Sequence, residues 1–107
     1  MGDHGFDEIQ RDNISPNFSG FHWRSHGRGV NIYFVEGQSI VIIYGEMPAV
    51  EDLDVLVFGE TEHINKRYYL GERRIEFIPL NDRFRIQKLL VEWLADKGMR
   101  HDISVGR

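Results

Sequence analysis

The chain has no cysteine, and this absence removes several classes of site at once. Without thiols there is no disulfide framework, no cysteine zinc site, no iron–sulfur cluster and no thiol nucleophile. The absence also fits a reducing compartment, so we expect a cytoplasmic protein. Long hydrophobic runs are lacking as well. The longest, Ile40–Tyr44, is far shorter than the roughly 20 residues of a membrane-spanning helix, so we expect no membrane partner.

Lysine and arginine are absent from residues 36–62, although this segment carries seven acidic residues. Residues 63–107 instead carry ten lysines and arginines against six acids, and the whole chain has a formal charge of −4. Charges grouped in this way indicate an uneven surface, which bears on partners more than on fold. The acids that we take as candidate partner-binding residues are Glu46, Glu51, Asp52, Asp54, Glu60 and Glu62.

The clearest structural pattern is a β-hairpin over residues 30–44. Apolar residues alternate with Asn31 and Tyr33 in its first half, as in a strand with one face on the core. Glycine at 37 suits a tight turn because it accepts positive φ at little cost. The unbroken apolar run that follows predicts a central strand covered on both faces. A short strand before this hairpin would turn Phe21 and Trp23 to one side and His22 and Arg24 to the other.

The segment 48–57 fits two structures. Pro48 suits the first position of a helix, with Glu51 and Asp52 in the first turn. The β-branched residues Val55 and Val57 instead favour a strand over 53–58, ended by Gly59, and we prefer this interpretation.

A second hairpin is predicted around Gly71, with Ile75 and Phe77 facing the core and Pro79 ending it. One helix follows over residues 81–97, with Asn81 or Asp82 as its N-cap and Gly98 just beyond its end. Its predicted buried stripe consists of Ile86, Leu89, Leu90, Trp93 and Leu94. A weaker apolar line consists of Phe84, Val91 and Ala95, through which a homodimer would form.

These elements predict the α+β class: an antiparallel meander of four to six strands with one C-terminal helix packed on one face. We divide the chain into a flexible N-terminal arm over 1–16, a single domain over 17–103 and a frayed tail over 104–107.

Histidines and acids offer one alternative function, a small metal-dependent enzyme. It would use His22, His26, Glu60, Glu62 and His63 in one cleft. Against it, His22 and His26 would lie about 13 Å apart on a straight strand, too far to share a zinc ion. We interpret Gly59–Tyr69 as a solvated turn in which the chain changes charge. No serine lies in a G-x-S-x-G elbow and no glycine loop suits a phosphate, so we assign no catalytic residue, metal or cofactor.

Nucleic-acid binding is a second alternative, through the basic hairpin Lys66–Arg74, where Tyr68 and Tyr69 could stack on bases. The acidic balance of the chain makes nucleic acid the less favoured partner. The interpretation that we prefer is a non-enzymatic protein-binding module. Immunity proteins and antitoxins that neutralise a basic, nuclease-like toxin share this small and acidic character.

Overall fold

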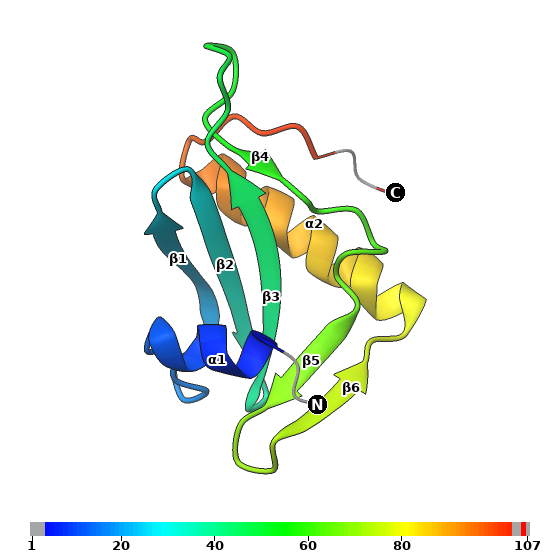
Figure 1. The fold of residues 1–107 in the computed structure, drawn as a ribbon. Helices are drawn as coiled ribbons and strands as arrows, with labels where there is room; N and C mark the ends of the chain where they lie inside the picture. The colour runs from blue at the N-terminus through cyan, green and yellow to red at the C-terminus, as the bar shows by residue number, and fades with distance from the viewer. Residues whose placement is uncertain (1–3, 104–105, 107) are drawn as a thin grey trace.

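A six-stranded antiparallel sheet forms the centre of the molecule, with one helix on each of its faces (Figure 1). The computed structural model describes residues 4–103 and 106. Its elements are α1 (His4–Arg11), β1 (Gly20–His26), β2 (Gly29–Glu36), β3 (Ser39–Glu46), β4 (Leu56–Val57), β5 (Lys66–Tyr69), β6 (Arg74–Phe77) and α2 (Leu80–Asp96). The strand order is β1-β2-β3-β5-β6, and β4 also pairs with β3. The predicted α+β class, antiparallel sheet and C-terminal helix are confirmed.

The hairpin of β2 and β3 follows the sequence pattern closely. Its two-residue turn places Gly37 and Gln38 at φ 55° and 68°, the left-handed region that this kind of turn requires. Val41 and Ile43 point toward α2, whereas Ile40 and Ile42 point toward α1, and all four are buried. The continuous apolar run is therefore a strand covered on both faces, as predicted.

Helix α2 packs along one face of the sheet through the predicted stripe. Ile86, Leu90 and Leu94 have no exposed surface, and Leu89 and Trp93 pack at the rim of the same cluster. Gly98 adopts φ 69° as predicted, so the Met99 N–H can return to the Leu94 carbonyl at 2.9 Å.

The predicted cap of α2 was wrong. Pro79 occupies the N-cap position, and no side chain caps the first turn. Asn81 and Asp82 lie inside the helix instead. Proline presets the backbone for helix entry, and the Asp82 carboxylate accepts hydrogen bonds from Arg67 and Arg85 rather than from the helix backbone.

The second face of the sheet is covered by α1, in a region predicted to be a flexible arm. Phe6 and Ile9 are buried against this face, each worth about 1.5–3 kcal/mol of hydrophobic free energy. The Phe6 ring meets Tyr68 edge-on at 5.1 Å between centroids. Asn13 at φ 55° ends the helix turn and directs Ile14 into the same cluster. The sheet thus has a helix on each face. A helix as short as α1 is marginal by itself, and packing of its apolar side against the sheet stabilises it.

The ambiguous segment 48–57 contains no helix. Residues 47–55 extend beyond the end of the sheet, and the chain returns as the two-residue strand β4 (Figure 1). Gly45 makes this pairing feasible, because a Cβ at that position would lie 2.8 Å from the Leu56 carbonyl oxygen. The preferred strand interpretation was right in type and too long in extent.

Phe77 does not face the core, contrary to the prediction; 69% of it is exposed. It lies on the same side of β6 as Ile75, and α1 covers that side only as far as Ile75. The next residue, Ile78, is buried against α2 instead. The frayed tail proposed for 104–107 lies mostly outside the described residues. No helix in the described part of the chain is long and apolar enough to cross a membrane.

Candidate protein-interaction surface

The six candidate acids lie at the end of β3 and on either side of β4 along the chain, and β4 pairs with the end of β3 through Gly45–Val57 and Glu46–Leu56. Glu51, Asp52 and Asp54 lie in the segment that precedes β4, and Glu60 and Glu62 lie in the loop that follows it. The fold therefore places these acids at the end of β3 and on the two connections that flank β4, the first reaching beyond the end of the sheet and the second leading to β5 (Figure 1).

Folding neutralises some of these charges. The Asp54 carboxylate binds the Arg100 guanidinium at 3.2 Å and its backbone N–H at 2.7 Å, and these bonds hold the pKa of Asp54 below its usual value. Glu36, outside the candidate set, pairs with Arg85 at 2.6 Å. In contrast, Glu46, Glu51 and Asp52 are exposed and form no ion pair within the described residues.

Two partly exposed aromatic rings lie among the acids. Tyr44 at the end of β3 and Phe58 just after β4 are 42% and 45% exposed. A hollow of about 390 Å³ between them is lined by Tyr44, Phe58, Glu62, His63 and Asn65. The Phe58 N–H donates to the Tyr44 carbonyl at 2.8 Å, which fixes the two residues side by side. We call the six candidate acids, together with Tyr44 and Phe58, the β4 surface.

Further carboxylates contact residues that line the hollow. The Tyr44 hydroxyl donates to Glu8 Oε2 at 2.5 Å, so helix α1 contributes an acid that the sequence grouping had not included. His63 Nε2 lies 3.6 Å from Glu62 and 3.9 Å from Glu60. The sequence analysis missed Tyr44 and Phe58 because both belong to apolar runs. The glycine that follows each of them was the available signal that the strand ends there.

The five residues of the hypothetical metal enzyme do not meet. His22 and His26 lie on edge strand β1, and strands β2 and β3 separate them from the loop of Glu60, Glu62 and His63. His22 bonds the Phe18 carbonyl at 2.8 Å. Within the described ranges, no three acidic or histidine side chains are grouped to hold a metal ion.

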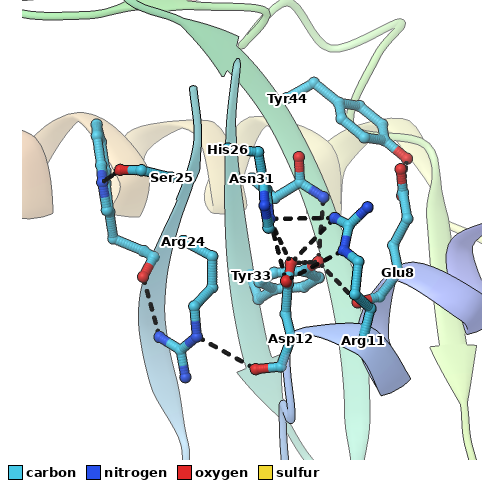
Figure 2. A network of polar contacts seen from close by, with 10 residues as sticks. Glu8, Arg11, Asp12, Arg24, Ser25, His26, Asn31, Tyr33 and Tyr44 are labelled. Carbon is cyan, nitrogen blue, oxygen red and sulfur yellow. Dashed lines mark hydrogen bonds and ion pairs between the residues drawn. The ribbon is translucent and has the colours of Figure 1, made fainter. Parts of the chain in front are cut away.

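His26 belongs to a different cluster, centred on Asp12 at the end of α1 (Figure 2). The Asp12 side chain is 4% exposed. Its carboxylate accepts hydrogen bonds from Arg11, from His26 Nε2 at 3.1 Å and from the Tyr33 hydroxyl, and the Asp12 carbonyl accepts one from Arg24 at 3.2 Å. Sequence reasoning had placed none of these groups together.

The surroundings of Asp12 shift two pKa values. Burial alone would raise the pKa of Asp12, but the hydrogen bonds from Arg11, Tyr33 and His26 outweigh it and lower that pKa to about 2. Burial, together with the bond to the carboxylate, raises the pKa of the Tyr33 phenol. Among the described residues no buried side-chain polar atom lacks a partner. We therefore interpret this cluster as a structural clamp that joins α1 to β1 and β2.

The hairpin proposed for nucleic acid is largely engaged within the molecule. Arg67 bonds Asp82, and Arg74 bonds Glu72 and Glu76 at 3.1 and 3.0 Å. Tyr68 is 5% exposed and packs under α1, so its ring is not available for base stacking.

The line proposed for a homodimer is only partly open. Phe84 is 38% exposed and Val91 is half-buried.

Comparisons with known proteins add no relative. A scan against protein-family models, a search of curated proteins and a search of solved structures each gave no significant match.

Proposed function

We propose that this protein is a non-enzymatic binding module that takes a basic protein partner on its β4 surface. The observation that carries the proposal is the coincidence, at one sheet edge, of unpaired acids and partly exposed aromatic rings. Protein interfaces combine a few aromatic anchors with a charged rim, and charge complementarity speeds the encounter of the partners. Arginine is the partner side chain that best fits this combination, because it both pairs with carboxylates and stacks on aromatic rings.

The partner class that we favour is a basic, nuclease-like toxin, with this chain as an immunity- or antitoxin-type inhibitor. An acidic inhibitor would cover a substrate-binding surface built for phosphates. The unpaired acids and the aromatic rings of the β4 surface support this partner class.

The test begins with affinity capture from the source cell, using wild-type protein and two charge variants. The first, Glu51→Gln/Asp52→Asn/Glu62→Gln, removes three charges from the β4 surface. The second, Asp7→Asn/Glu92→Gln/Asp96→Asn, removes three exposed charges elsewhere. Asp54 is kept because its pairing with Arg100 would confuse binding with folding.

The proposal is supported only if the first variant, and not the second, loses binding of the partner. We expect a basic protein to be retained by wild type and by the second variant, with association slowed about tenfold or more in the first. Equal retention by both variants would overturn the assignment of the surface. A captured partner that is acidic would overturn the proposed partner class.

The aromatic centre has its own test. Phe58→Ala should weaken the complex mainly through faster dissociation, by about 2 kcal/mol if the ring is an anchor. Phe77→Ala removes an aromatic ring outside the β4 surface that is still more exposed, 69% against 45% for Phe58, and should leave binding unchanged.

A further inference from the structure

Both tryptophans of the chain line a second hollow, on the opposite side of the sheet from β4. Trp23 comes from edge strand β1 and Trp93 from helix α2. The hollow has a volume of about 450 Å³, and its lining residues are Phe21, His22, Trp23, Arg24, Trp93, Lys97 and Met99.

Aromatic rings form the apolar wall of this hollow. The Phe21 and Trp93 rings stack with centroids 5.2 Å apart and planes 24° apart. The Trp23 indole N–H donates to Ser25 Oγ at 2.9 Å, so its polar atom is already satisfied and the rest of the ring offers hydrocarbon. Both indoles are only partly buried, and large apolar surface left open beside a hollow favours an apolar ligand.

The ionisable groups at this hollow are basic. Arg24 donates to the backbone carbonyls of Asp12 and Trp23 at 3.2 and 2.9 Å, which holds its guanidinium on the α1 side of strand β1. The Lys97 ammonium lies 5.8 Å from the centre of the Trp93 ring. Neither residue forms an ion pair with a described carboxylate. Lys97 is therefore the basic group that an anion lying against the Trp93 ring would meet.

We propose that this hollow binds an organic anion with an apolar body, of the class of medium-chain carboxylates. The hydrocarbon would lie against Trp23 and Trp93, and the carboxylate would meet Lys97. Charge complementarity selects an anion over a cation, and the aromatic wall selects an apolar body over a small inorganic ion. The site is separate from the β4 surface, so either proposal stands without the other.

The probe is decanoate, titrated into the full chain while tryptophan emission is recorded. Since the chain has only these two tryptophans, binding in the hollow should produce a saturable spectral shift, with a Kd of about 1 mM or tighter for a ligand of this size. Trp23→Phe leaves Trp93 as the sole reporter and should retain the shift. Decyltrimethylammonium, of equal chain length and opposite charge, should bind at least about fivefold more weakly.

A matched pair of charge-reversal variants, one at the C-cap of α2 and one in the middle of the helix, locates the anion. Lys97→Glu should weaken decanoate binding about fivefold or more, and the neutral Lys97→Met should weaken it less. Lys88→Glu makes the same change in net charge on the exposed face of α2 and should leave the Kd unchanged. An absent or non-saturable shift, equal binding of the cationic probe, or equal losses in the two Glu variants would overturn the proposal.

Discussion

The Asp12 carboxylate accepts hydrogen bonds from side chains that lie on, or next to, three elements: Arg11 on α1, His26 on β1 and Tyr33 on β2. The negative charge and the acceptor oxygens of Asp12 matter here more than the size of its side chain. An amide in the same place would present an N–H₂ group to donors and would leave the Arg11 charge without its partner.

We predict that Asp12→Asn lowers the free energy of unfolding by about 1–3 kcal/mol at pH 7. Urea denaturation followed by circular dichroism measures this. Asp7→Asn is the matched control, since Asp7 is exposed on the same helix and should change stability by less than about 0.5 kcal/mol. Equal effects of the two variants would contradict the clamp.

Acid provides a second prediction at the same residue. The pKa of Asp12 is lowered from 3.8 to about 2 on folding, so its contribution is complete above the unfolded value and is lost as pH falls toward the folded value. Between pH 4 and pH 2 the wild type should lose about 2 kcal/mol more than Asp12→Asn. The measurement is the free energy of unfolding of both proteins against pH over this range. Parallel curves for the two proteins would contradict the prediction.

At the scale of elements, α1 depends on its close approach to the sheet. Gly5 permits this approach, because a Cβ at that position would overlap the Tyr68 ring. Alanine is a better helix former than glycine by about 1 kcal/mol, so intrinsic propensity and packing make opposite predictions here.

We predict that packing decides and that Gly5→Ala destabilises the protein, by roughly 1–3 kcal/mol for an overpacked contact. Gln10→Ala, on the exposed side of α1, should be neutral or slightly stabilising. Denaturation midpoints give the totals, and hydrogen exchange of the α1 amides shows whether the helix itself loosens. A stabilised Gly5→Ala variant would mean that α1 does not dock in this way.

The phase of α2 has an equally direct test. Leu90→Ala should cost about 2–5 kcal/mol, since Leu90 is fully buried between helix and sheet. Phe84→Ala removes a larger side chain that is 38% exposed and should cost less. Thermal unfolding of both variants ranks them, and the reverse order would show that the helix faces the sheet with another side.

At the scale of the whole molecule, folding changes the charge pattern of the chain. Bases from the C-terminal part neutralise acids from the middle, through Arg85 with Glu36 and Arg100 with Asp54. Among the described residues, the charges that stay without an ion pair include Glu46, Glu51 and Asp52 of the β4 surface and Lys97 at the hollow beside β1.

This distribution predicts a salt-dependent association with the basic partner. Raising the ionic strength from about 0.01 M to 0.15 M shortens the Debye length from roughly 30 Å to 8 Å, so the association rate should fall steeply while the dissociation rate changes little. Stopped-flow mixing at several salt concentrations measures both rates. An association rate that ignores salt would remove the steering role of Glu46, Glu51 and Asp52.

Local patterns in the sequence were enough to determine the hairpin of β2 and β3 and the helix α2. Alternation in Val30–Phe34, the turn at Gly37 and the stripe through Ile86 and Leu90 depend on neighbours a few residues apart, and such neighbours interact in the same way in most contexts. The acidic segment 36–62 was likewise plain from composition.

Only the tertiary structure decided how these parts meet. Whether the first residues form a docked helix depends on Tyr68, more than 50 residues away, and the exposure of Phe77 depends on where α1 stops covering the sheet. The clamp on Asp12 and the pairing of Asp54 with Arg100 join residues that no local period relates. Burial and charge pairing are properties of the packed chain, because each requires a surface that distant residues supply.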